Sequence, residues 1–451
     1  NQGAVRKMIQ TLVWTAIFIL IMAIINFINF SIAQHITRLK EIGVRKMMGS
    51  SRMQLIRQLM TEYILIVAIA ALISLPIYII TSPIFEHVLM RKLPSLVELP
   101  IYFFGLLIIM TLFIGLLAGL YPAIKLSNVA ILPAVKSQFS TLGGKQLVRK
   151  ILLFFQFGVA LLLLVCTLII SKQVDLFLHS NLGYNKDYLL TVQVPRDWSE
   201  NGVRKMETLQ QELSQQPEVK SVSLSYETPG LLGSNMQPAF GTTDDREIQV
   251  QRITSDSHFL ETYEIPLIAG TFLSKHYATN ADNRPVVINK KAMDDFGFKN
   301  AEQAIGQQIA INDPNYKITI VGVAEDFVAN SLHQASPPII WMDVHESLQY
   351  RYLSIRLKQG PLSNAVQQLE KKWKTLLPDA PFEYKFMDER IKNLYETELQ
   401  LHRASQIATV VSLLIVVLGL TGLISLSIHL RNKEVGIRKV LGASLAHLML
   451  L

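Results

Sequence analysis

The chain has 451 residues, half of them hydrophobic and 17% charged, and its formal net charge is +8. This length allows two to four domains, and the apolar residues are clustered rather than periodic, which points to membrane spans. The single cysteine, Cys166, lies inside an apolar run. It therefore excludes a disulfide framework and a cysteine-based metal cluster.

The positive charge is concentrated in three short segments. Residues 34–60 contain six Lys or Arg and one acidic residue, residues 123–150 contain five and none, and residues 431–439 contain four and one. The long segment 172–403 contains 24 basic and 30 acidic residues. Short basic loops beside apolar runs are typical of the cytoplasmic side of a membrane protein. We therefore expect the three basic segments inside the cell and the acidic segment outside, and we expect no nucleic acid as a partner.

Five apolar windows contain no Asp, Glu, Lys or Arg over the roughly 20 residues that a spanning helix needs. The predicted transmembrane helices are residues 9–33, 63–81, 99–124, 151–171 and 404–428. Pro76 is predicted to interrupt the second of them. Alternating orientation then predicts that residues 34–60, 125–150 and 431–446 are cytoplasmic and that residues 82–98 and 172–403 are extracytoplasmic, in agreement with the loop charges.

Two smaller patterns lie within the predicted spans. Gly115 and Gly119 permit close packing of two helices, although small residues at this spacing also occur by chance. Asn26 and Asn29 can hydrogen-bond a neighbouring helix or line a path through the membrane. Packing is the simpler interpretation of the two asparagines.

The segment 172–403 is predicted to fold as an α+β domain, because alternating apolar runs and amphipathic helices recur between turn signals. Two strand–helix–strand units are expected, one over residues 189–226 and one over residues 353–386. Two such units can form a split β-α-β sheet of the ferredoxin-like type. A second, β-rich lobe is expected as an insertion over residues 231–344. The predicted fold class is a multi-span α-helical membrane protein with a large extracytoplasmic α+β domain, made of a ferredoxin-like, porter-type lobe and an inserted β-rich lobe.

Both connections of this domain to the membrane are expected to be helical. Residues 389–403 contain no Pro or Gly and lead into the fifth span. The fourth span is expected to continue to His179, before Asn181 and Gly183 end it. Two uninterrupted helices are therefore predicted to tie the outer domain to the membrane.

A charged motif occurs twice, 393 residues apart, each time directly after a predicted span. Arg-Leu-Lys-Glu-Ile-Gly-Val-Arg-Lys-Met-Met-Gly starts at residue 38, and Arg-Asn-Lys-Glu-Val-Gly-Ile-Arg-Lys-Val-Leu-Gly starts at residue 431. The matching positions are Glu41, Gly43, Arg45, Lys46 and Gly49 in the first copy and Glu434, Gly436, Arg438, Lys439 and Gly442 in the second.

On a helix at the membrane edge, the apolar residues of this motif can bury one side while its cations reach solvent or anionic headgroups. In the first copy these apolar residues are Ile42, Val44, Met47 and Met48. The inner glycines suggest a bend or a close backbone approach, and Gly49 and Gly442 are expected to end the element. A simple positive-inside anchor explains the charge but not the matching Glu and Gly positions. These favour a docking element that meets the same kind of partner twice.

With this motif the chain resembles the FtsX/MacB-like permeases of ABC transporters, in which a Glu-Ile-Gly-Ile-Arg-Lys/Arg-x-x-Gly-Ala pattern marks the helix that couples to the ATPase. Residues 41–51 and 434–444 match it, and residues 259–270, 305–306 and 320–327 resemble the family's core domain. The resemblance implies that the ten motif residues named above couple to the ATPase, and that residues 172–403 form a MacB-like core domain with helical stalks.

The resemblance also implies a tandem, eight-span protein of the bacterial cytoplasmic (inner) membrane, of which this sequence is an internal fragment. Residues 1–8 would then end a first extracytoplasmic domain, and residues 447–451 would begin a further transmembrane helix. The implied activity is movement of the outer domain driven by ATP hydrolysis on a separate subunit, for efflux, export, or lipoprotein or peptide handling.

The chain has no phosphate-binding loop of its own: Gly143-Gly-Lys145 is followed by Gln146 rather than Ser or Thr. We therefore expect no cofactor in this chain, ATP on a partner P-loop ATPase, and no catalytic or metal-ligating residues. Membrane lipid and an extracytoplasmic protein are further expected partners, and the oligomeric assembly stays open. A sensory or regulatory protein that controls an outer partner is the main alternative, and a membrane-anchored enzyme is the third.

Overall fold

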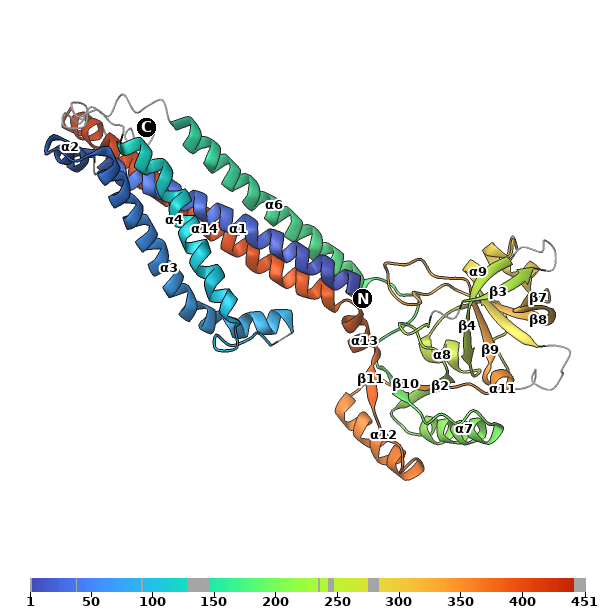
Figure 1. Cartoon of the computed structure of the whole chain (residues 1–451). Coiled ribbons are helices and arrows are strands. Elements are labelled where there is room, and N and C mark those ends of the chain that lie inside the picture. Colours follow the sequence, from blue (N-terminus) through green and yellow to red (C-terminus); the bar gives the residue numbers. More distant parts are fainter. Residues whose placement is uncertain are drawn as a thin grey trace. The chain divides into compact units, whose positions relative to one another are not determined.

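The computed structural model describes residues 2–37, 39–90, 92–127, 146–233, 236–241, 247–274 and 284–441 (Figure 1). The chain divides into two compact units. The helical unit consists of Asn1–Val174 and Thr397–Leu451, and the outer domain of Asp175–Glu396. This is the predicted fold class: a multi-span helical membrane protein with a large extracytoplasmic domain.

Five helices among the described residues are long and apolar enough to cross a membrane. They are α1 (Gln2–Thr37), α3 (Arg52–Leu89), α4 (Ile101–Ser127), α6 (Gln146–His179) and α14 (Glu396–Val440). A short helix, α2 (Leu39–Met47), lies between α1 and α3 in the sequence. Many large apolar side chains on these helices are exposed, as expected where lipid replaces water as the solvent.

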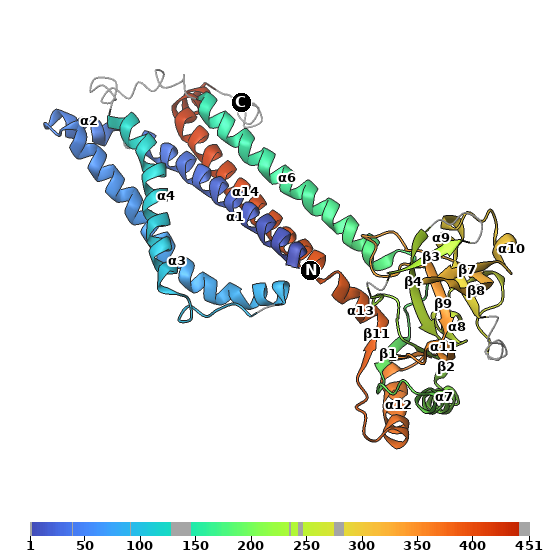
Figure 2. The ribbon, with the colours of Figure 1, turned by 45° about the vertical axis from the view of Figure 1, so that its right-hand side comes forward.

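The prediction that Pro76 interrupts the second span is wrong. Helix α3 continues through both Pro76 and Pro83, and Figures 1 and 2 show it changing direction in its second half. A proline lacks the N–H that would bond the carbonyl four residues earlier, so it bends a helix without necessarily ending it. At Pro83 that carbonyl belongs to Ile79, and the Ser82 hydroxyl donates to it at 3.1 Å. Hydroxyl donors of this kind let a membrane helix tolerate proline.

Helices α3 and α4 pack closely through the predicted glycine pair. A Cβ built on Gly115 would lie 3.0 Å from Cγ1 of Ile64, and one on Gly119 would lie 2.8 Å from Cδ2 of Tyr63. The close-packing interpretation of Gly115 and Gly119 is therefore confirmed. The two glycines let α4 approach α3 at distances that a larger residue would prevent.

Polar side chains join α1 to two other helices of the helical unit. The Asn26 amide donates to the carbonyl of Ile415 on α14 at 3.1 Å, and the Gln156 amide on α6 donates to the carbonyl of Met22 at 3.1 Å. The predicted helix-to-helix hydrogen bond is thus formed by Asn26. Asn29 is buried without a hydrogen-bond partner for either amide atom within the described residues.

Four strands of the outer domain form the predicted ferredoxin-like sheet. They are β1 (Leu189–Gln193), β2 (Val219–Ser225), β10 (Tyr352–Leu357) and β11 (Tyr384–Phe386). Their order is β11-β1-β10-β2 with antiparallel neighbours. Helices α7 (Glu200–Ser214) and α12 (Leu362–Leu376) follow β1 and β10, so each strand–helix–strand unit is present. Their apolar residues pack with Leu190, Leu353 and Ile355 on one face of this sheet.

The inserted lobe is a closed β-ring, a feature that the sequence patterns did not predict. Its strands are β3 (Met236–Gly241), β4 (Glu247–Ser255), β5 (Leu267–Gly270), β6 (Pro285–Asn289), β7 (Gln308–Ile311), β8 (Asp313–Ala324) and β9 (Ile339–Asp343). The order β4-β3-β7-β8-β6-β9 closes because β9 also pairs with β4, and β5 adds to β8. Closure leaves those six strands without a free edge. Among the described strands, the pairing of Ser225 with Ser255 joins this ring to the ferredoxin-like sheet.

Short helices complete the outer domain. They are α8 (Phe259–Tyr263), α9 (Lys290–Asp295), α10 (Ala301–Ala304), α11 (Val344–Ser347) and α13 (Met387–Leu394).

The core beside α8 and α13 is aromatic. It includes residues from both segments that connect the outer domain to the membrane helices. Trp341, Phe259 and Phe327 are almost fully buried in it. Phe177, near the end of α6, stacks on Tyr395 with ring centroids 4.7 Å apart. These two segments are therefore fixed to one cluster within the outer domain.

The two predicted uninterrupted helices differ in outcome. Helix α6 continues to His179 as expected. The other helix is broken: α13 ends at Leu394 and α14 begins at Glu396. Tyr395 lies at the break, buried against Phe177, and its hydroxyl accepts the backbone N–H of Leu332 at 2.8 Å. Packing of this tyrosine outweighs a local sequence that contains no helix breaker.

Candidate coupling site

The first copy of the charged motif forms α2 and the turn that ends it. The N–H of Ser50 bonds the carbonyl of Arg45 at 3.1 Å, and the N–H of Gly49 bonds that of Lys46 at 3.1 Å. Gly49 has a φ of 90°, in the left-handed region. This pair of bonds around a left-handed glycine is the Schellman motif, which closes a helix. The prediction that Gly49 ends the element is confirmed.

Helix α3 begins immediately after this turn, with a capping box at its N-terminus. The Ser51 hydroxyl accepts the N–H of Gln54 at 3.4 Å, and the Gln54 side chain accepts the N–H of Ser51 at 2.8 Å. This reciprocal capping box satisfies two backbone donors at the start of α3. Both sides of the connection between α2 and α3 are thus held by hydrogen bonds.

One side of α2 is anchored in the helical unit. Ile42 is only 7% exposed and packs in a cluster with Leu55, Leu59, Tyr63 and Ala123. Gly43, next to it in the sequence, is also buried. The anchor therefore uses the centre of the motif.

The expectation that Val44, Met47 and Met48 share this buried side is wrong. All three are exposed, Met48 to 84%, and Met53 at the start of α3 is exposed as well. A helix turns by about 100° per residue, so Val44 and Met47 lie about 200° and 140° from Ile42. They point away from the anchored side. We call Val44, Met47 and Met48 the methionine face.

Two charged residues of α2, Glu41 and Arg45, form an ion pair. Arg45 Nη2 lies 2.7 Å from Oε1 of Glu41, one turn earlier, and Arg45 Nη1 donates to the side chain of Gln58 on α3 at 2.6 Å. Arg45 therefore links α2 to α3 as well as reaching solvent, and Glu41 orients it. This ion pair gives the glutamate of the first copy a role in a basic motif. Spacing of four residues on a helix was the signal that could have revealed it.

The second copy of the motif continues α14. Glu434, Gly436, Arg438 and Lys439 lie in this helix, of which the structure describes the backbone but not these side chains. Gly442 lies outside the described residues. Within the described part of the chain, no group of three or more His, Cys, Asp and Glu residues could hold a metal ion.

Two family models match the chain in succession. Residues 14–131 match the FtsX-like permease C-terminal model, and residues 157–372 match the MacB-like periplasmic core domain. The chain is an FtsX/MacB-like ABC transporter permease. Permeases of this family generally work with an ABC ATPase subunit. No curated protein matches the permease.

The permease is also similar to several solved structures. The periplasmic region of MacB from Actinobacillus actinomycetemcomitans is 14% identical, with a TM-score of 0.34 over 49% of this chain and 97% of that one. A domain of a putative permease from Porphyromonas gingivalis is 17% identical, with a TM-score of 0.30 over 45% and 89%. The extracellular domain of the noncanonic ABC-type transporter YknZ from Gram-positive bacteria is 12% identical, with a TM-score of 0.30 over 43% and 98%.

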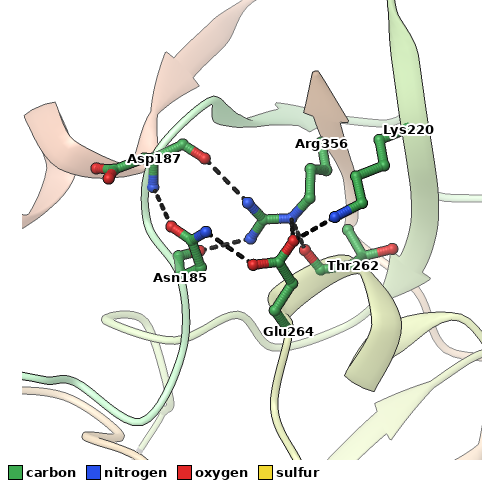
Figure 3. Close-up of polar contacts among 6 residues, drawn as sticks. All are labelled: Asn185, Asp187, Lys220, Thr262, Glu264 and Arg356. Atoms are coloured by element: carbon green, nitrogen blue, oxygen red, sulfur yellow. Dashed lines mark hydrogen bonds and ion pairs between the residues drawn. The ribbon is translucent and has the colours of Figure 1, made fainter. Parts of the chain in front are cut away.

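The outer domain of the permease contains a buried arginine that sequence reasoning missed. Figure 3 shows Arg356 of β10 at the centre of a polar cluster. Its guanidinium donates to the carbonyls of Thr262 at 2.6 Å, Asn185 at 2.6 Å and Asp187 at 3.0 Å. Glu264 lies 3.8 Å from Arg356 Nε and pairs with Lys220 at 2.6 Å. These bonds tie the segment before β1 to the end of α8, so Arg356 has a structural role.

Proposed function

We propose that this permease couples ATP hydrolysis on a separate P-loop ATPase to movement of its outer domain. The ATPase binds α2 and the second copy of the motif at the end of α14. Its closing and opening displace both elements, and the helices transmit the displacement through the bacterial cytoplasmic membrane. The work done outside is efflux or export, or the handling of a lipoprotein or peptide.

The observation that carries this proposal is the two-sided construction of α2. One side is anchored through Ile42, and hydrogen bonds close the C-terminal end of α2 and the start of α3. The opposite side exposes the methionine face in a segment that charge predicts to be cytoplasmic. An element that is rigidly attached yet presents large apolar side chains is suited to receive force from a bound protein. A positive-inside anchor needs neither feature.

Transmission to the outside is supported by the way the outer domain holds its two connecting segments. Phe177 at the end of α6 and Tyr395 between α13 and α14 are buried and stacked on each other. His333 packs against the Phe177 ring with centroids 4.8 Å apart. Because one aromatic cluster holds both segments, a displacement of either helix acts on the same part of the outer domain.

The test is copurification of the full-length permease with its ATPase from native membranes, with the ATPase identified by its phosphate-binding loop. Met48→Glu puts a charge on the methionine face, and Arg438→Glu reverses a charge in the second motif. Each is expected to lower the recovered ATPase at least tenfold, while Arg204→Glu, on the exposed face of α7, leaves recovery unchanged. Full recovery with both motif variants would contradict the proposal.

The alternative is a sensory or regulatory protein whose outer domain controls an extracytoplasmic partner. The same purification separates the two functions. Recovery of a signalling partner without any P-loop ATPase favours the alternative, whereas ATP hydrolysis that depends on Met48 favours the permease function.

A further inference from the structure

Arg356 lies on the face of the ferredoxin-like sheet that α7 and α12 do not cover, and Arg351 and Arg390 lie near Tyr352, which points to the same face. Leu353 and Ile355 of β10 point to those helices, so the alternating residues Tyr352 and Arg356 point to the other face. Arg351 precedes β10, and Arg390 comes from α13, which packs against β1 and β11. The three differ sharply in their partners.

Arg356 has the partners expected of a buried cation. Three backbone carbonyls accept its hydrogen bonds, and the carboxylate of Glu264 is 3.8 Å away (Figure 3). Buried charges are normally paired in this way. Arg356 has both hydrogen-bond acceptors and a nearby negative charge, so it is the reference for Arg351 and Arg390.

Arg351 and Arg390 lack such partners. Their guanidinium carbons lie 5.2 Å and 5.6 Å from the ring centroid of Tyr352. Arg390 donates one hydrogen bond, to the Thr228 hydroxyl at 3.0 Å. Nε of Arg351 is buried without a partner. Among the described residues, no carboxylate forms an ion pair with either of them.

The proximity of two unpaired cations has a cost. Burial lowers the pKa of Arg390, the nearby Tyr263, Tyr352 and Tyr184 raise it, and the positive charge of Arg351 lowers it by a smaller amount. Both guanidinium groups stay protonated, because arginine does not lose its proton in proteins. An anion that contacted the exposed parts of both cations would remove their repulsion. Both side chains are partly exposed, so a ligand from solvent can reach them.

We infer that Arg351 and Arg390 form a binding site for a doubly charged oxyanion, such as a phosphate monoester. Two guanidinium groups supply two positive charges and planar forks that match tetrahedral oxyanions. The buried Thr228 hydroxyl accepts from Arg390 and helps to orient its guanidinium group. Because none of these residues belongs to the motif, this site is independent of the proposed ATPase docking.

The test is calorimetric titration of the full chain in a neutral detergent with inorganic phosphate at constant ionic strength. The wild-type chain is expected to bind phosphate saturably. Arg351→Gln and Arg390→Gln each remove one charge-assisted contact and are expected to weaken binding at least tenfold, and the double variant to abolish it. Arg204→Gln removes an equally charged but exposed arginine and is expected to bind as the wild type does.

Further measurements keep loss of binding apart from loss of folding. Each variant's thermal unfolding is recorded in chloride, and Arg351→Lys, which keeps the charge but loses the fork, is expected to bind with intermediate affinity. Competition with glycerol 3-phosphate and with micellar phosphatidic acid distinguishes a soluble phosphate monoester from a lipid headgroup. The inference is overturned if wild-type chain does not bind phosphate, if acetate binds as tightly, or if both folded glutamine variants bind unchanged.

Discussion

Large buried side chains stabilise the outer domain, whereas close contacts at small residues stabilise the helical unit. The largest fully buried side chains of the outer domain are aromatic, among them Trp341, Trp373 and Tyr263. In the helical unit, large side chains such as Phe154 and Ile80 are exposed, and the contact between α3 and α4 is made at Gly115 and Gly119. Water drives large apolar groups inward, whereas lipid does not, so membrane helices gain stability from close approach.

This difference predicts which substitutions are harmful in each region. In the outer domain, removing volume should cost most because it leaves a cavity. In the helical unit, adding volume at a helix contact should cost most because the helices must separate. Trp341→Ala and the glycine substitutions in α4 test this contrast, and the pH dependence of Glu227 tests how completely the outer domain excludes water. They follow from the largest expected effect to the smallest.

Trp341→Ala should have the largest effect. Trp341 is fully buried among Phe259, Phe272 and Phe327. Loss of a buried tryptophan costs about 3–5 kcal/mol. Hydrogen exchange of the full chain should therefore become faster across residues 175–396 and change little in the membrane helices. Trp198→Ala is the matched control, since Trp198 is 45% exposed and should cost clearly less. Equal effects of the two variants would contradict the contrast.

Glu227 should make the stability of the outer domain depend on pH. Burial raises the pKa of Glu227 to about 7, and the backbone N–H of Thr254, which donates to its carboxylate at 3.0 Å, opposes this only in part. The folded state then holds a proton that the unfolded state has already released. Between about pH 4.5 and 7 stability should fall as pH rises, by on the order of 3 kcal/mol, and stay level above that.

The measurement is hydrogen exchange of residues 219–255 at pH 5 and pH 8, corrected for the intrinsic rates. Glu227→Gln mimics the protonated carboxyl and should remove most of the pH dependence. Glu200→Gln, at a side chain that is 75% exposed, should leave it unchanged. If the wild-type outer domain is more stable at pH 8 than at pH 5, Glu227 is not buried as described.

The strands of the ferredoxin-like sheet could be predicted from the sequence, but the closed ring could not. Strands β1, β2, β10 and β11 alternate with the amphipathic helices α7 and α12, and local periodicity identifies each of them. Closure of the ring depends on the pairing of β4 with β9, whose residues Gln251 and Ile339 are far apart in the chain. No local pattern encodes such a pairing.

The candidate site shows the same limit. Repetition of Glu41, Gly43 and Gly49 pointed to a docking element, and the left-handed Gly49 could be expected from its place after a helical run. The outward direction of Met47 and Met48 could not be predicted from the sequence, because it depends on the packing of Ile42. Likewise, the break at Tyr395 follows from its stacking on Phe177, which lies in a distant segment.

Gly119→Ala and Gly105→Ala should have effects of opposite sign, although both glycines lie in α4. Alanine is the better helix former by up to about 1 kcal/mol. At Gly105 no atom lies within 4 Å of the added Cβ, so the variant should be slightly stabilised. At Gly119 the new carbon would lie 2.8 Å from Tyr63 and 3.1 Å from Met60, and overpacking costs about 1–3 kcal/mol. Unfolding of the full chain in detergent, followed by hydrogen exchange in α3 and α4, measures the difference.

Because Tyr63 also packs against Ile42, Gly119→Ala should loosen α2 as well. Faster exchange in α2 with Gly119→Ala, but not with Gly105→Ala, would connect helix spacing in the membrane to the position of the methionine face. Unchanged exchange in α2 would show that α2 does not depend on this packing.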